Sequence, residues 1–155
     1  MSIKEEKNLQ QIDKTNLFHP ITNLKTHISE DVLILDRGEG IYVYDKQGKK
    51  YLEGLAGLWC TSLGYGVKEL GEAASEQMTK LGYSSLFTSK SHEPAILLAE
   101  KLIEMSPYEK GKVFFGNSGS DANDTQLKLY TYYNNALGNN SKKKIISRIK
   151  GYHGV

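Results

Sequence analysis

The residues best suited to chemistry lie in the stretch Phe114–Asp124, which reads FFGNSGSDAND. A short apolar run ends in a loop of small residues, and the loop leads into a helical pattern. The unpaired N–H groups and the positive end of a helix N-terminus together form an anion site that suits phosphate. Gly119 would let a ligand approach the backbone, and Ser118 and Ser120 would add hydroxyl donors. Alternatively, Ser120 or Asp121 serves only to cap the helix.

Two familiar nucleotide-binding motifs are absent from this stretch. No Gly-Lys-Ser/Thr follows the loop, and the dinucleotide fingerprint G-x-G-x-x-G does not occur. A nucleotide-binding βαβ domain is therefore supported by the glycine-containing loop alone. Tight binding of ATP or NAD would be needed to revive that hypothesis.

A second candidate is Trp59, the single tryptophan, in the small-residue stretch Gly54–Cys60 (GLAGLWC). An aromatic side chain presented from such a loop can form the wall of a pocket, and packing in a core is the alternative. We expect Cys60 to be a buried small residue. Its neighbours include no base that could activate a thiol nucleophile.

The four histidines, at positions 19, 27, 92 and 153, do not show metal-ligand spacing, so no zinc or iron site is predicted. His92 precedes a Glu-Pro pair and is expected in the cap region of a helix. Tyr152 and His153 directly follow a predicted strand, where open α/β sheets place their ligands. An exposed pair of loop residues is the alternative there.

The elements expected to position these residues begin with a three-stranded antiparallel meander. Its first two strands are predicted at Val32–Leu35 and Ile41–Tyr44, which are β-branched and aromatic, and the third ends near Tyr51–Leu52. Glycine-containing turns at 37–40 and 45–48 separate them. The polar residues before the meander predict a loose arm over 1–16, and then a short helix or extended lead-in up to His27 because Pro20 interrupts the pattern.

Helical periodicity and a βαβ order follow the meander. Apolar residues at i, i+3 and i+4 spacing predict helices over 70–81 and 95–105, with Pro94 in the first turn of the second. A third helix is predicted over 121–137, between two apolar runs read as strands, Lys112–Gly116 and Lys142–Lys150. Strand, helix and strand in this order predict a parallel sheet, and therefore an α/β fold.

Composition and charge narrow the class of protein. The chain has 155 residues, 39% hydrophobic and 25% charged, which is typical of a globular protein. A net charge of +2 does not indicate a nucleic-acid partner, and a single cysteine excludes an intrachain disulfide. No apolar run approaches the roughly 18 residues of a membrane span, so no membrane partner is expected. The polar N-terminus does not resemble a secretory signal, and a cytoplasmic location is expected.

Five stretches, taken together, resemble the class III pyridoxal-phosphate-dependent aminotransferases of ω-amino-acid:pyruvate type. They are GIYVYDKQGKKYLEGLAGLWC, GYGVKELGEAASEQM, HEPAILLAEKL, VFFGNSGSDANDTQLKL and KIISRIKGYHG. The resemblance implies the N-terminal part of fold type I: the small-domain meander and helices, and the first βαβ of the large-domain sheet. The expected segments are an N-terminal arm (1–31), a small-domain portion with connecting helices (32–106) and the start of the large cofactor-binding domain (107–155).

The resemblance also implies roles for single residues. Gly119 and Ser120 match the loop that holds the phosphate of pyridoxal 5'-phosphate, and Tyr152 matches the aromatic residue that stacks on the pyridine ring. Trp59 matches a wall of the substrate pocket, and Phe87 is expected to be a pocket residue offered across the interface of a homodimer. The implied substrates are a small amine or ω-amino acid and a 2-oxo acid such as pyruvate.

Two departures from the family qualify this expectation. The family usually reads Ser-Gly-Ser-Glu-Ala-Asn, whereas Asp121 stands here in place of Glu. The lysine that forms the Schiff base with the cofactor, and the acid on the pyridinium nitrogen, lie in the family beyond the position of Val155. We therefore expect an N-terminal segment of an aminotransferase, with no catalytic residue of its own and inactive alone. The alternatives are a non-catalytic truncated remnant, or an interaction subunit that pairs with a separate C-terminal chain.

Overall fold

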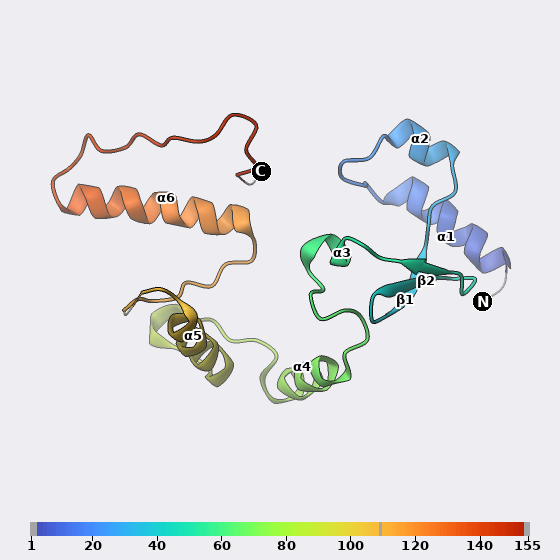
Figure 1. Cartoon of the computed structure of the whole chain (residues 1–155), viewed down its shortest axis with the longest axis horizontal. Coiled ribbons are helices and arrows are strands. Elements are labelled where there is room, and N and C mark those ends of the chain that lie inside the picture. The colour runs from blue at the N-terminus through green and yellow to red at the C-terminus, as the bar shows by residue number, and fades with distance from the viewer. Residues whose placement is uncertain (1–2, 109, 154–155) are drawn as a thin grey trace. The chain divides into compact units, whose positions relative to one another are not determined.

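The computed structural model describes residues 3–108 and 110–153, so parts of the predicted segments 1–31 and 107–155 lie outside it (Figure 1). The chain divides into two compact units, Met1–Tyr83 and Ser84–Val155. The division falls inside the predicted small-domain segment. None of the helices in the described ranges is long and apolar enough to cross a membrane.

The first unit begins with two helices, α1 (Ile3–Asn16) and α2 (Leu24–Ser29). The prediction of a loose arm over 1–16 is therefore wrong for its described part. The helix is anchored through tertiary contacts that a polar pattern does not reveal: the Gln10 amide donates to the carbonyl of Val32 and accepts from its N–H, both at 2.7 Å. The short helix α2 agrees with the expected lead-in, and Asn23 caps it.

A three-stranded antiparallel sheet follows, with strands β1 (Leu35–Glu39), β2 (Tyr42–Asp45) and β3 (Lys50–Leu52) in the order β1-β2-β3. The predicted meander is confirmed. The first strand lies later than predicted, because the connection to β2 needs only the two residues between Glu39 and Tyr42. The residues that the pattern assigned to a turn therefore belong partly to the strand.

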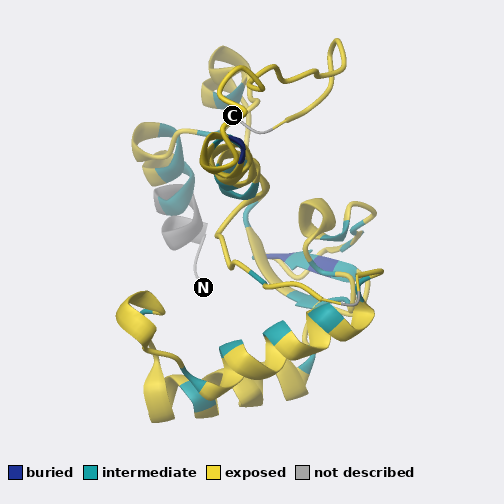
Figure 2. Ribbon diagram, turned by 90° about the vertical axis from the view of Figure 1, so that its left-hand side faces the viewer, coloured by how far each residue is buried: buried dark blue, intermediate teal, exposed yellow. Residues whose placement is uncertain are grey.

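The sheet holds most of the small buried core. Among the described residues, Val43 of β2 is the one buried apolar side chain, and Asp45 beside it is buried as well. The Asp45 carboxylate accepts hydrogen bonds from Tyr51 Oη (2.8 Å) and from the N–H groups of Gln47 and Lys49, which closes the turn between β2 and β3. Figure 2 shows how little of the rest is buried.

Helices dominate the remainder of both units. The first unit ends with the single turn α3 (Ala56–Trp59) and with α4 (Lys68–Leu81), and the second contains a short 3-10 turn (Phe87–Ser89), α5 (Glu93–Met105) and α6 (Gly119–Ala136). The three predicted helices are thus confirmed. His92 is the N-cap residue of α5, although its side chain makes no capping hydrogen bond.

The two predicted strands of the second unit are not formed. Lys112–Gly116 and Lys142–Lys150 flank α6 as expected, but neither segment is paired into a sheet within the described chain. A strand requires a hydrogen-bonded neighbour, and these two segments do not provide one for each other. Their apolar side chains stay exposed: Phe114 is 69% exposed, and Ile146 and Ile149 are more than 90% exposed.

Candidate functional site

Two hydrogen bonds that both involve Asp121 close the loop before α6. Ser118 is the N-cap residue, and its Oγ accepts from the N–H of Asp121 at 3.0 Å. The Asp121 carboxylate in turn accepts from the N–H of Asn117 at 3.3 Å. The cap is therefore Ser118, not Ser120 or Asp121. With the helix begun at Gly119, its positive end faces the loop, as the sequence predicts.

Two glycines in this loop have different surroundings. A Cβ atom at Gly119 would meet nothing within 4 Å, so the backbone there is open to a ligand. A Cβ atom at Gly116 would lie 2.5 Å from Oδ2 of Asp121. Gly116 thus makes room for the Asp121 carboxylate, a role that the sequence does not reveal. The Asp121 side chain folds back onto the loop that precedes it.

Tyr152 lies in a segment that returns to the beginning of α6 (Figure 1). The Asn123 side-chain amide donates from Nδ2 to the carbonyl of His153 at 2.8 Å, across 30 residues. Asn123 is four residues after Gly119, about one helical turn. Gly119, Ser120 and the Tyr152 backbone therefore belong to one region of the second unit. Sequence reasoning missed Asn123, although its position one turn from the glycine was an available signal.

Trp59 lies in a left-handed turn. All four residues of α3, from Ala56 to Trp59, have φ between 49° and 68°. Backbone bonds from Trp59 N to Leu55 O and from Cys60 N to Ala56 O, both 2.8 Å, close the turn. A left-handed conformation costs about 1–2 kcal/mol for each residue that has a Cβ, so surrounding contacts must hold it. Trp59 is 81% exposed, rather than packed in a core of the described unit.

Glu53 supplies those contacts. Its Oε2 accepts from the N–H of Gly57 at 2.7 Å, and its Oε1 accepts from the N–H of Leu55 at 2.9 Å. These bonds stabilise the ionised carboxylate, chiefly the bond from Gly57, and lower the pKa of Glu53 below its ordinary value. Tyr65 Oη also donates to the same carboxylate, at 3.4 Å. Sequence reasoning missed Glu53. The signal that could have identified it is an acidic residue directly before the turn sequence Gly-Leu-Ala-Gly.

Phe87 and Cys60 are also at the surface of their units. Phe87 begins the 3-10 turn and is 79% exposed, and the following residues Thr88 and Ser89 have positive φ. Cys60 is exposed, so the expectation of a buried thiol is wrong. Its Sγ lies 3.4 Å from the carbonyl oxygen of Leu58 in the same turn.

Comparison with known proteins assigns the chain to a family. The family model for class III aminotransferases matches residues 25–155. The chain is 43% identical over 150 residues to a diaminobutyrate–2-oxoglutarate transaminase of Halomonas elongata, covering 96% of this chain and 32% of that protein. It is 54% identical over 123 residues to gamma-aminobutyrate transaminase 1, mitochondrial, of Oryza sativa subsp. indica, covering 79% of this chain and 24% of that protein.

Solved structures agree with the sequence relatives. The omega transaminase from Pseudomonas jessenii in complex with PMP is 54% identical and superposes with a TM-score of 0.90, covering 94% of this chain and 32% of that one. The chain belongs to the class III aminotransferase family and has the fold of the N-terminal part of the fold type I, pyridoxal-phosphate-dependent transaminases. It spans about a third or less of the length of these relatives.

Proposed function

We propose that this chain is the N-terminal segment of a pyridoxal-phosphate-dependent aminotransferase. The reaction would move an amino group from an amine or ω-amino acid to pyruvate or another 2-oxo acid. The hydrogen bond between Asn123 Nδ2 and His153 O carries the proposal, because it joins the Tyr-His segment to the first turns of α6. The names of the relatives, which include diaminobutyrate and gamma-aminobutyrate transaminases, support the class of amino donor.

The cofactor-binding roles follow from the loop. Bound pyridoxal phosphate would supply an electron sink for the reacting carbon. Gly119 and Ser120 would hold its phosphate at the positive end of α6, where a Cβ-free backbone leaves open space. Tyr152, which is 85% exposed, would stack on the pyridine ring. PMP, the amine form of this cofactor, in the Pseudomonas jessenii structure supports the assignment.

Two exposed aromatic residues are proposed to contact the substrate. Trp59 and Phe87 would each contribute an aromatic wall for the amine, and each is about four-fifths exposed in its own unit. Large aromatic side chains bury about 150–250 Å² when they pack against a ligand or a partner, so both residues offer area for such a contact. We further propose a cytoplasmic homodimer in which Phe87 lies at the subunit interface.

The chain alone is proposed to be inactive, because the lysine that holds the cofactor in this family has no counterpart here. The extent of exposed apolar surface supports association with further polypeptide. On α5, for example, Ile96, Leu97 and Leu98 are each more than half exposed. The same surface favours the alternative function, an interaction subunit that pairs with a separate C-terminal chain.

The phosphate-binding role can be tested with matched glycine variants. Binding of pyridoxal phosphate and of phosphate-free pyridoxal to the purified chain would be measured by fluorescence titration. We expect wild type to prefer the phosphorylated form, and Gly119→Ala to lose this preference because the new methyl group fills the open space. Gly71→Ala in α4 is the control, since its Cβ also meets nothing within 4 Å. Equal binding of both ligands by wild type would refute the role.

The catalytic half of the proposal needs a second experiment. The chain would be co-purified with a separately expressed C-terminal part of the Pseudomonas jessenii omega transaminase, and transfer of an amino group to pyruvate would be assayed. We expect turnover from the pair and none from the chain alone. Turnover by the chain alone would overturn the claim that it lacks a catalytic lysine. A stable but inactive pair would favour the interaction subunit.

A further inference from the structure

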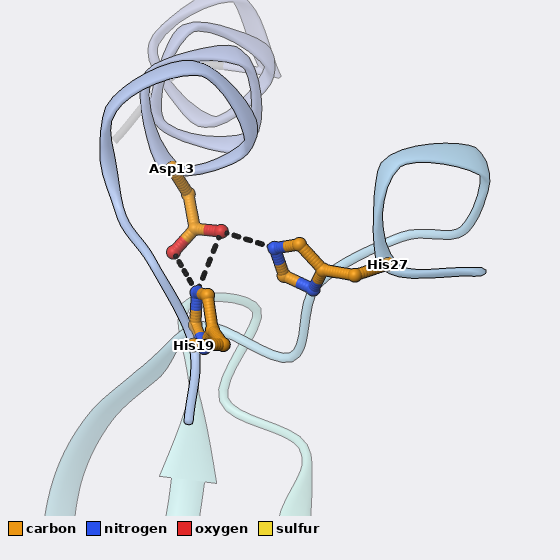
Figure 3. A group of neighbouring side chains, drawn as sticks. All are labelled: Asp13, His19 and His27. Carbon is orange, nitrogen blue, oxygen red and sulfur yellow. Dashed lines mark hydrogen bonds and ion pairs between the residues drawn. The ribbon is translucent and has the colours of Figure 1, made fainter. Parts of the chain in front are cut away.

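Three side chains from consecutive segments meet in the first unit. Asp13 is on α1, His19 is in the loop that follows, and His27 is on α2 (Figure 3). The carboxylate contacts both imidazole rings, with His27 Nε2 at 2.9 Å and His19 Nε2 at 3.0 Å from Oδ1. The second oxygen, Oδ2, is 3.1 Å from His19 Nε2. The ring centroids are 4.2 Å apart, so both rings approach the carboxylate from one side.

The three groups are partly shielded from solvent. The side chains of His27 and Asp13 are 11% and 16% exposed, and that of His19 is 28% exposed. An ionised carboxylate only accepts hydrogen bonds, so each Nε2 carries a proton in this arrangement. Those two protons occupy the space between three potential ligand atoms. A metal ion that took their place would be coordinated by two neutral imidazoles and one carboxylate.

The distances suit such a replacement. The three donor atoms all lie within 4.8 Å of one another. A zinc ion about 2.0–2.2 Å from each ligand in a tetrahedral site separates its ligands by about 3.3 Å. Both contacts to Oδ1 are already close to that separation. The site could therefore form by small rotations of the side chains, without movement of either helix.

We propose that Asp13, His19 and His27 form a binding site for a zinc-like divalent transition-metal ion, with one coordination position left to water. Two imidazoles and a carboxylate suit Zn²⁺ and its first-row neighbours, whereas Mg²⁺ and Ca²⁺ prefer oxygen ligands alone. The bound ion cross-links α1 to α2 and stabilises the N-terminal segment. The ligands are spaced 6 and 8 residues apart, and only the fold of the two helices brings them together.

Zinc binding to the full 155-residue chain, free of any histidine tag, tests the proposal. Isothermal titration with zinc alone is expected to give one ion per chain. Asp13→Asn and His27→Gln each remove a ligand and are expected to weaken binding by more than about 100-fold, since loss of even a residue that only hydrogen-bonds a metal ligand costs about 10–100-fold. Asn retains an oxygen acceptor for the imidazole N–H, so the hydrogen-bonded arrangement survives in that variant. Unchanged far-UV circular dichroism would establish that each variant is folded.

Two controls separate this site from other ligands. His92→Gln, in the second unit, is expected to leave the affinity unchanged. Cys60→Ser is included because the exposed thiol could bind zinc by itself, and it too should leave the affinity unchanged. Cobalt(II) should give visible bands of a tetrahedral ion without thiolate charge transfer. The proposal is overturned if wild type binds no zinc, if the two ligand variants bind like wild type, or if Cys60→Ser abolishes binding.

Discussion

The side-chain amide of Asn123 donates a hydrogen bond of 2.8 Å to the main-chain carbonyl of His153. This bond connects the first turns of α6 to the segment that holds Tyr152, 30 residues further along the chain. Because Gly119 and Ser120 begin the same helix, one asparagine ties together the residues proposed to bind the phosphate and the ring of the cofactor. Neither residue of the pair is itself a proposed cofactor contact.

Replacing Asn123 should therefore weaken cofactor binding without removing a contact to the cofactor. A single hydrogen bond contributes about 1 kcal/mol, so Asn123→Ala is expected to bind pyridoxal phosphate about fivefold more weakly. Fluorescence titration measures this affinity. Asn135→Ala, near the other end of the helix, is the control and should bind like wild type. Equal affinities of the two variants would contradict the positioning role.

The Glu53 carboxylate should make the Trp59 turn sensitive to acid. The hydrogen bond from Gly57, followed by that from Leu55, lowers the pKa of Glu53 in the folded state. Its contribution to stability is therefore complete above the unfolded pKa of about 4.3, and it is lost as the pH falls through the lower folded value. Trp59 is the single tryptophan, so its fluorescence is expected to report the loss below about pH 4.

A variant distinguishes this local change from general acid unfolding. Glu53→Gln keeps the shape but removes the charge, and it is expected to loosen the turn at neutral pH and to abolish the acid transition of Trp59 fluorescence. Far-UV circular dichroism, followed over the same pH range, monitors the helices. If the fluorescence and helix signals of wild type always change together, Glu53 does not control the turn separately.

The N-cap of α6 should contribute measurably to the stability of the second unit. Ser118 Oγ accepts the N–H of Asp121, and loss of such a cap costs about 1 kcal/mol. Ser118→Ala is expected to lower the midpoint of urea unfolding followed by circular dichroism. Ser118→Asn, which can also accept the N–H, should restore most of the loss. A midpoint unaffected by Ser118→Ala would show that the cap is not needed.

Exposed apolar surface should govern the behaviour of the isolated chain. Val43 is the one buried apolar residue in the described ranges, whereas side chains such as Phe114 and Ile146 are largely exposed. A cooperative core of ordinary size is therefore lacking, and we expect low solubility and a broad thermal transition. Differential scanning calorimetry tests this expectation. A sharp transition of a monomeric sample would contradict it.

Local patterns in the sequence were sufficient to predict the three longer helices that follow the sheet. Helical spacing around Leu70, Leu98 and Leu129 predicts α4, α5 and α6, because each helix forms its hydrogen bonds within its own segment. The meander was predictable for a similar reason, since its strands are joined by short turns that determine their pairing. The glycine and serine residues at the start of α6 likewise mark a helix N-terminus from sequence alone.

Contacts between segments distant in the sequence could not be predicted from local patterns and are seen only in the tertiary structure. The segment Lys112–Gly116 has the composition of a buried strand, but a strand exists only through pairing with a neighbour, which composition does not specify. The polar pattern of α1 does not reveal the hydrogen bonds between Gln10 and Val32. The spacing of the histidines likewise does not predict that His19 and His27 both contact Asp13. Sequence determines the local geometry of this protein, whereas the juxtaposition of its functional groups depends on long-range contacts that local patterns do not encode.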